Sequence, residues 1–149
     1  MMFRGRYEHT IDPKGRVSVP SRFRDVLKRE YGKEVVILTP DDSCIAAFPF
    51  DEWKKLEKKA LSFPFMHREA KVFLRYYISG AVEINIDDHG RLLIPLSFRD
   101  HAQLKKDVVF VGMLNRFEIW DKEIWAQELA RYRENFEKTS EAIAEWMVL

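Results

Sequence analysis

A stretch near the start of the chain recurs past its middle, and this duplication is the strongest constraint on the fold. Residues 5–25 and residues 80–100 align without gaps at an offset of 75, and ten of the 21 aligned positions are identical. Weaker similarity continues beyond them: residues 35–39 match 108–112, Phe48 matches Trp120, and Trp53 matches Trp125. A repeat of this length predicts two copies of one supersecondary unit in a single chain.

Each copy opens with a pattern typical of a β-hairpin. Hydrophobic and polar residues alternate in a first strand, which predicts that the hydrophobic face of the strand is buried. A turn sequence follows whose glycine, Gly15 or Gly90, can adopt a positive backbone φ angle. A short return strand then ends at Pro20 or Pro95, because proline cannot donate to a strand ladder. The alternating residues are Tyr7, His9 and Ile11 in the first copy and Val82, Ile84 and Ile86 in the second.

The rest of each copy reads as a short helix and two more strands. Phe23, Val26 and Leu27 share one face of the first helix. The closing strands are predicted at 35–39 and 44–48 in the first copy and at 108–112 and 116–120 in the second. A unit of about 45 residues buries too little surface to be stable alone, so we expect the copies to pack as a pseudo-twofold pair. The sequence leaves open whether repeats pair within one chain or between chains.

Helical patterns link and follow the repeats. Asp51 is the expected N-cap of one helix, residues 66–78 form a second amphipathic pattern, and Asp121 is expected to cap a long last helix. The last helix carries an apolar stripe at heptad-like spacing, which fits packing within the chain or contact with a neighbouring subunit. The stripe comprises Trp125, Leu129, Tyr132, Phe136, Ile143 and Trp146, and runs on to Leu149.

These patterns predict an α+β fold with a mainly β core and four parts. The parts are a first repeat at 1–50, a helical linker at 51–78, a second repeat at 79–121 and a C-terminal amphipathic helix at 122–149.

Charge is distributed unevenly along the chain although the net charge is only +1. Residues 1–29 contain eight Arg or Lys and three acids, whereas residues 117–149 contain four basic residues and eight acids. A locally basic segment attracts polyanions whatever the net charge, so the first repeat is the predicted place for nucleic acid to bind.

Other classes of protein lack support in the sequence. There is no secretion signal and no apolar run near the ~20 residues that span a bilayer, so a cytoplasmic location is expected. Cys44 is the single cysteine and is expected to be a buried structural thiol. The four histidines lack metal-site spacing and no glycine-rich phosphate loop is present. We therefore expect no enzyme activity, no metal, no cofactor and no small-molecule substrate.

Both predicted turns carry the pattern Asp-x-x-x-Arg, at Asp12–Arg16 and at Asp87–Arg91. Each turn leads into the phrase Gly-Arg-h-x-h-Pro, in which h is a hydrophobic residue. Together with the duplication and the opening Met-Phe-Arg-Gly at 2–5, these motifs resemble those of MraZ family proteins. These are bacterial transcriptional regulators with two AbrB-like (SpoVT-AbrB) domains. The resemblance implies tandem swapped-hairpin β-barrel repeats that form an intrachain pseudo-dimer. It also implies a ring-shaped homo-oligomer on double-stranded DNA, at short direct repeats upstream of the division and cell-wall gene cluster, hence on the nucleoid.

The resemblance places DNA contact at the two turns, and the charges favour the first of them. The DNA-binding candidates are Arg16, Lys14, Arg4, Arg6, Arg22 and Arg91, with Asp12, Gly15, Asp87 and Gly90 as supporting residues. Each aspartate is expected to accept turn N–H groups or to pair with the arginine four residues later. Residues 80–100 hold two arginines against four acids, so the first repeat is expected to make most of the contact. Arg24/Asp25 and Arg99/Asp100 are expected to include ion pairs.

Two alternative functions compete with DNA binding by a regulator. An assembly scaffold would use the aromatic helices but leaves the basic N-terminal segment unexplained. An antidote protein of a toxin–antidote pair can also use an AbrB-like unit, but usually has one such unit and a disordered tail.

Overall fold

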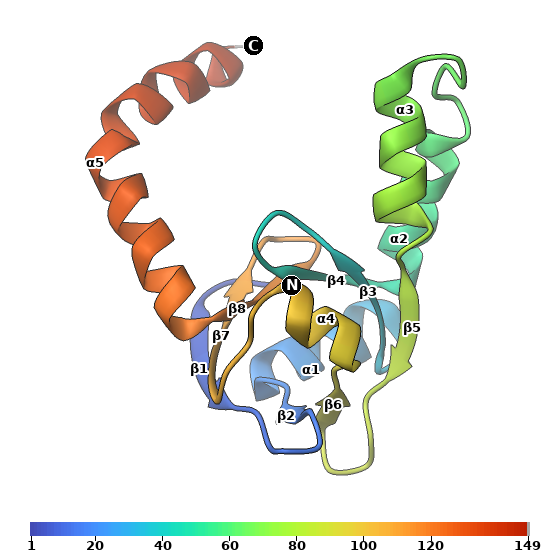
Figure 1. The fold of residues 1–149 in the computed structure, drawn as a ribbon, viewed down its shortest axis with the longest axis vertical. Coiled ribbons are helices and arrows are strands. Elements are labelled where there is room, and N and C mark those ends of the chain that lie inside the picture. Colours follow the sequence, from blue (N-terminus) through green and yellow to red (C-terminus); the bar gives the residue numbers. More distant parts are fainter. Residues whose placement is uncertain (149) are drawn as a thin grey trace.

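The structure is a computed structural model that describes residues 1–148. In chain order the elements are β1 (Arg6–Thr10), β2 (Arg16–Ser18), α1 (Ser21–Tyr31), β3 (Val35–Pro40), β4 (Ile45–Pro49), α2 (Phe50–Ala60), α3 (Arg68–Phe73), the π-helical turn η1 (Leu74–Ile78), β5 (Val82–Asn85), β6 (Arg91–Leu93), α4 (Leu96–His101), β7 (Asp107–Gly112), β8 (Phe117–Asp121) and α5 (Lys122–Met147). The order β-β-α-β-β-α occurs twice, with α3 and η1 inserted before the second copy (Figure 1). The predicted α+β class is confirmed, and the strand pairs of the sheet are antiparallel.

The two repeats exchange their first strands. The main sheet has the order β1-β7-β8-β4-β3-β5, so β1 adds to the second repeat and β5 adds to the first. Tyr7 lies opposite Phe110 in one ladder, and Ile84 lies opposite Val36 in the other. The short strands β2 and β6 pair only with each other and form a separate two-stranded ribbon. The repeats therefore pair within one chain, which the sequence had left open.

The second halves of the repeats align at an offset of 72 rather than 75. Val36 lies opposite Pro49 in the β3–β4 hairpin, and Val108 lies opposite Asp121 in the β7–β8 hairpin. The predicted match of 35–39 with 108–112 is thus wrong by one residue, although the four strands occur within one residue of their predicted ends. The offset falls from 75 to 72 because α4 has six residues where α1 has eleven, and because the connection that follows each helix also differs in length.

One hydrophobic core is shared by both repeats. Phe23 lies at its centre, with ring centroids 5.4 Å from Phe3, 5.3 Å from Tyr7 and 5.1 Å from Phe117. Buried members come from both copies: Val17, Leu27, Leu38 and Ile45 from the first, and Leu92, Ile94, Phe98 and Ile119 from the second. Because each copy supplies about half of this core, neither copy can bury its apolar surface without the other.

Two smaller apolar clusters pack α2 and α5 against the outer face of the sheet. Phe48 packs against Trp53 of α2, with ring centroids 5.3 Å apart, and Trp120 packs against Trp125 of α5 at the same separation. Cys44 is buried in the cluster under α5, and burial raises the pKa of its thiol.

Two expectations about these elements are wrong in detail. Asp51 is not an N-cap: α2 begins at Phe50, Pro49 holds the cap position, and Asp51 lies in the first turn. Asp121 occupies the equivalent position before α5 and does cap it, accepting from the N–H groups of Glu123 and Ile124. Val82, predicted to be buried, is 41% exposed because β5 is an edge strand.

Helices α2, α3 and α5 extend from the sheet on the side opposite the β2–β6 ribbon, whereas α1 and α4 lie in the body (Figure 1). Trp125 packs against Trp120 and Tyr132 against Trp125, but the rest of the α5 stripe is uncovered, with Phe136 62% exposed and Trp146 68% exposed. Packing within the chain therefore explains only the first turns of α5, while Leu149 lies outside the described residues. None of the helices in residues 1–148 combines the length and hydrophobicity that crossing a bilayer requires.

Replacing Phe23 by alanine should lower the free energy of unfolding by about 3–5 kcal/mol, because it empties the centre of the shared core. Urea denaturation followed by circular dichroism measures this loss. Phe65→Ala is the matched control, since Phe65 is 58% exposed, and it should cost less than about 0.5 kcal/mol. Equal losses in the two variants would contradict the shared core.

Candidate nucleic-acid interface

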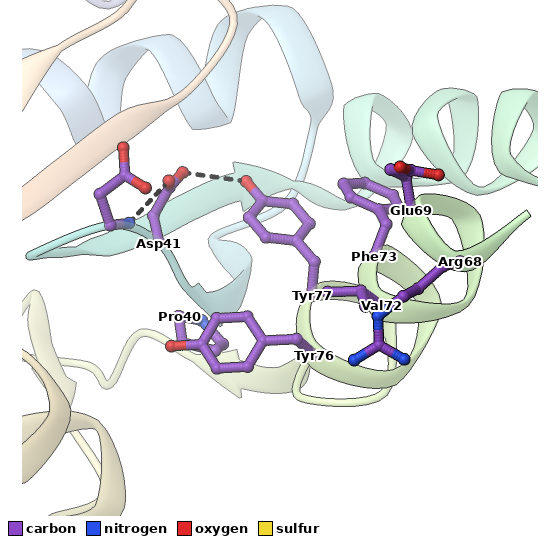
Figure 2. Close-up of a pocket in the computed structure, with 9 residues that line it drawn as sticks. Pro40, Asp41, Arg68, Glu69, Val72, Phe73, Tyr76 and Tyr77 are labelled. Carbon is purple, nitrogen blue, oxygen red and sulfur yellow. Dashed lines mark hydrogen bonds between the residues drawn. The ribbon is translucent and has the colours of Figure 1, made fainter.

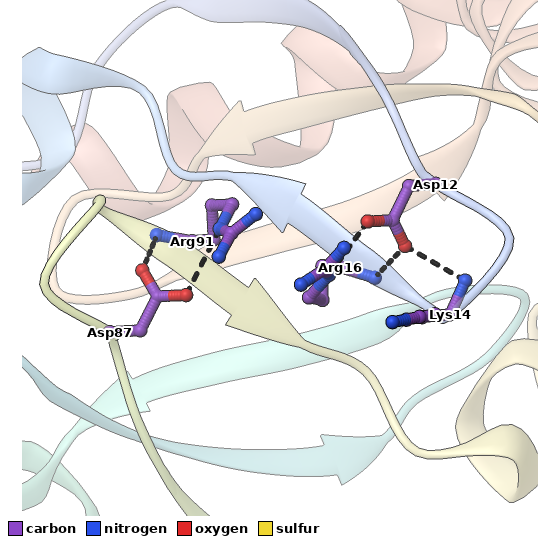
Figure 3. Close-up of polar contacts among 5 residues, drawn as sticks. All are labelled: Asp12, Lys14, Arg16, Asp87 and Arg91. Carbon is purple, nitrogen blue, oxygen red and sulfur yellow. Dashed lines mark hydrogen bonds and ion pairs between the residues drawn. The ribbon is translucent and has the colours of Figure 1, made fainter.

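The first turn is organised by the carboxylate of Asp12. Its Oδ1 accepts hydrogen bonds from the backbone N–H groups of Lys14 and Arg16, both at 2.9 Å, and its Oδ2 accepts one from Nε of Arg16 at 2.7 Å (Figure 3). Backbone bonds from Asp12 N–H to Arg16 O and from Gly15 N–H to Asp12 O close the turn. Gly15 has φ of +89°, a conformation that suits glycine.

The second turn repeats this arrangement. Oδ1 of Asp87 accepts from the backbone N–H groups of His89 and Arg91 at 2.9 Å, and Oδ2 accepts from Nε of Arg91 at 3.0 Å. In both turns the aspartate thus fixes the arginine through Nε. The two terminal nitrogens of Arg16 and Arg91 make no hydrogen bond within residues 1–148 and are free to donate to an external acceptor.

Strands β2 and β6 bring the two arginines onto one surface. Arg16 lies opposite Leu93, and Ser18 lies opposite Arg91, so these four side chains share a face of the ribbon. Val17, the middle residue of β2, and Leu92, the middle residue of β6, point to the other face and are buried in the core. We call the outer face of Arg16, Ser18, Arg91 and Leu93, together with exposed Lys14, the ribbon face.

The ribbon face carries positive charge in a form that can contact other molecules. Opposite corners of such a ribbon lie about 7–8 Å apart, so Arg16 and Arg91 can reach the same small region of a ligand. Each guanidinium offers a fixed fork of donors, which matches a phosphate or the edge of a guanine. The paired aspartates neutralise part of this charge but also hold the arginines in place, which reduces the entropy lost on binding.

The other basic candidates lie apart from the ribbon face. Arg4 and Arg22 line a hollow of about 650 Å³ beside α1, which also includes Asp25. Arg6 is at the end of β1 away from the turn, and its guanidinium lies 5.4 Å from the ring centroid of Trp125. Of the six candidates, the structure therefore gathers Lys14, Arg16 and Arg91.

Arg24 and Arg99 have roles that the sequence reasoning did not identify. No ion pair joins Arg24 to Asp25 or Arg99 to Asp100 within residues 1–148, so that expectation is wrong. Each arginine instead packs against the turn glycine of the other repeat: a Cβ on Gly15 would lie 2.9 Å from Cζ of Arg99, and one on Gly90 would lie 2.6 Å from Cζ of Arg24. Both arginines are among the positions identical in the repeats, but identity alone does not indicate which turn they contact.

A separate hollow of about 570 Å³ lies between α3, η1 and the β3–β4 turn (Figure 2). Its acidic lining residues are Asp41, Asp42 and Glu69, and Tyr77 donates a hydrogen bond to Asp41. Arg68 is the one Arg or Lys among the residues that line the hollow, so the three carboxylates leave it acidic and it is not part of the basic surface.

The turns make a testable contribution to stability that is lost at low pH. Hydrogen bonds from the backbone N–H groups of Arg16 and Arg91 lower the pKa of Asp12 and Asp87 below the ordinary value of 3.8. A lowered pKa means that the stabilisation is present above pH 3.8 and is lost as the pH falls through the lowered values. In an NMR titration of labelled aspartate, both carboxyl groups should titrate below 3.8 in the folded protein, and midpoints at or above 3.8 would contradict the turn geometry.

Comparisons with known proteins agree with the duplicated architecture. A family described as "MraZ protein, putative antitoxin-like" matches residues 2–76 and again residues 77–145. Proteins named "Transcriptional regulator MraZ" from Thermoanaerobacter sp. (strain X514) and Pelotomaculum thermopropionicum are 42% and 41% identical over 144 residues, which is 97% of this chain and 95% and 97% of theirs. The protein of that name from Heliobacterium modesticaldum is 41% identical over 147 residues, 99% of this chain and 97% of its own. With both repeats matched and nearly the full length covered, the chain belongs to the MraZ family.

Proposed function

We propose that this protein is a sequence-specific DNA-binding regulator of transcription, and that the ribbon face is its DNA-binding surface. The observation that carries the proposal is the paired ribbon on which Arg16 and Arg91 share one face, each oriented by its own aspartate. The relatives named as transcriptional regulators support the same conclusion.

The dimensions and chemistry of the ribbon suit the major groove. A two-stranded antiparallel ribbon fits the major groove of B-DNA, which is about 12 Å wide. Arginine can donate two hydrogen bonds to one guanine, and Lys14 at the exposed turn can neutralise a phosphate. Arg4 and Arg22 beside α1, and Arg6 further away, then add charge that draws the DNA backbone toward the first repeat.

The first repeat is proposed to make most of the contact. Lys14 is replaced by His89 in the second turn, and Arg6 and Arg22 are replaced by Ala81 and Ser97. The second repeat contributes Arg91 to the ribbon face and otherwise completes the common core. The exchange of β1 and β5 supports a pair of swapped-hairpin barrels as the common architecture of the repeats.

A single ribbon reads too few bases for useful specificity, since one good contact gives about 1–3 kcal/mol of discrimination. We therefore propose that several subunits bind adjacent short direct repeats upstream of the protein's own gene, in the division and cell-wall cluster. Linking several weak sites in one assembly raises the overall affinity without new contacts. The protein would then act in the cytoplasm, on the nucleoid.

A ring-shaped homo-oligomer is supported by two unlike surfaces on the helices. The α5 surface exposes Phe136 and Trp146, and residues 133–148 hold four acids against two basic residues. The α2–α3 surface exposes Phe65 and Met66, and residues 50–78 hold seven basic residues against four acids. Apolar surfaces of opposite charge on one chain favour a head-to-tail contact, which generates a ring where the rotation closes.

Binding to DNA is tested by fluorescence anisotropy with the upstream DNA and with a shuffled sequence of equal length, in 50 and 200 mM salt. The wild type should prefer the upstream DNA, and affinity should fall steeply with salt. Arg16→Ala should lose about tenfold in discrimination, since a bidentate base contact disappears. Arg29→Ala, an exposed position on α1, is the matched control. Equal weak binding to both DNAs would contradict sequence reading, and no binding by a folded oligomer would favour a scaffold.

The inequality of the two turns is tested by charge reversal. Lys14→Glu should weaken binding far more than His89→Glu, because only the first turn presents a permanent positive charge at this position. The same anisotropy assay measures both variants. Equal losses would contradict the asymmetry between the repeats.

The head-to-tail contact is tested by light scattering coupled to size-exclusion chromatography. Phe136→Glu should reduce the subunit number, because it places a charge in the proposed apolar contact. Gln127→Glu introduces the same residue at an exposed position on the opposite side of α5 and should leave the assembly unchanged if the contact follows the apolar stripe. A wild type that is monomeric, or an unchanged assembly in Phe136→Glu, would overturn this part of the proposal.

A further inference from the structure

The packing of Arg99 and Arg24 across the repeat boundary points to a device that positions the DNA-contacting turns. Gly15 and Gly90 are buried at the points where the two turns meet the body of the protein. Each glycine touches the guanidinium of an arginine that belongs to the other repeat. Because a Cβ at either position would collide with that group, the close approach depends on glycine.

A continuous series of hydrogen bonds connects Arg99 to the first turn. Nε of Arg99 donates to the backbone oxygen of Ile94 at 2.9 Å, and the N–H of Ile94 donates to the oxygen of Gly15 at 2.8 Å. The N–H of Gly15 donates to the oxygen of Asp12 at 2.9 Å, and the carboxylate of Asp12 holds Nε of Arg16. A helix of the second repeat is thus linked to the arginine of the first repeat by four short polar contacts.

The reciprocal series in the other direction lacks one contact. The N–H of Val19 donates to the oxygen of Gly90 at 2.9 Å, and Gly90 donates to Asp87, which holds Arg91. Nε of Arg24, however, is buried and has no hydrogen-bond partner within residues 1–148. Arg24 therefore fills space against Gly90, whereas Arg99 both packs against its turn and is anchored.

We propose that Arg99 is a positioning residue for DNA recognition: from the second repeat it holds the Asp12–Arg16 turn of the first repeat in its binding conformation, and Arg24 does the same more weakly for the Asp87–Arg91 turn. The proposal rests on the function proposed above, because it gives the turns their purpose. Because each repeat holds the turn of the other repeat, the positions of Arg16 and Arg91 relative to each other are fixed. The half that binds DNA less strongly is then still needed for affinity.

Hydrogen–deuterium exchange in the full-length protein without DNA tests the crossed relation. Arg99→Gln should speed exchange several-fold in residues 12–18, and by a smaller factor in residues 87–93 because β6 pairs only with β2. Arg24→Gln should speed exchange more in residues 87–93 than in residues 12–18, and by a smaller factor than Arg99→Gln produces in residues 12–18. Arg29→Gln on the exposed side of α1 is the control and should change neither segment. Exchange that speeds up more in the variant's own repeat than in the other would overturn the proposal, since a local structural role predicts that pattern.

Binding to the upstream DNA supplies the second readout. Arg99→Gln should weaken binding about tenfold, the order expected when a charge-assisted hydrogen bond is lost. Arg99→Lys keeps the charge but loses the planar Nε–H donor, so it should weaken binding as well. Binding of Arg99→Lys at the wild-type level, with unchanged exchange in residues 12–18, would show that only charge matters and would overturn the proposal.

The outcomes separate this proposal from the proposed function. Wild-type protein that binds no DNA would refute the function, and a crossed exchange pattern would then still establish the mechanical link between the repeats. If both Arg99 variants fail to fold, as judged by circular dichroism, Arg24→Lys takes their place. Its exchange must then change more in residues 87–93 than in residues 12–18, or the proposal fails.

Discussion

The exchange of first strands between the repeats is the constraint on which the rest of the structure depends. β1 completes its ladder on β7 and β5 completes its ladder on β3, so the backbone groups of each hairpin are paired by the other copy. The same crossing places Phe23 among aromatic rings of both repeats and lets β2 meet β6. The ribbon face exists only because the copies are interleaved in this way.

Interleaving also allows the two copies to diverge without loss of the common body. Buried positions such as Phe23 and Phe98 are kept in both, as are the aspartates and glycines that shape the turns. The exposed positions have changed: His89 occupies the position that corresponds to Lys14, and residues 80–100 of the second copy are acidic. In the proposed function, one half then attracts DNA while the other half supplies structure and one more arginine.

The sequence predicted the elements well and their partners poorly. Periodicity and the turn sequences gave the strands within one residue, and Asp121 capped its helix as expected, because these features are local. Periodicity cannot predict contacts between residues that are far apart in the chain. Such features include the pairing of β1 with β7, the offset of 72 and the contact of Arg99 with Gly15. For the site, the repeated pattern indicated Arg16 and Arg91, but not that Arg6 lies against Trp125.

The most direct test of the account is hydrogen–deuterium exchange of the wild-type protein with and without its upstream DNA. Protection should be concentrated in residues 12–18 and 87–93, the two halves of the ribbon and its turns, and should be stronger in the first. Protection in residues 50–78 or 122–148 with none on the ribbon would contradict the account, because it would place the DNA on the helices at the opposite side of the sheet.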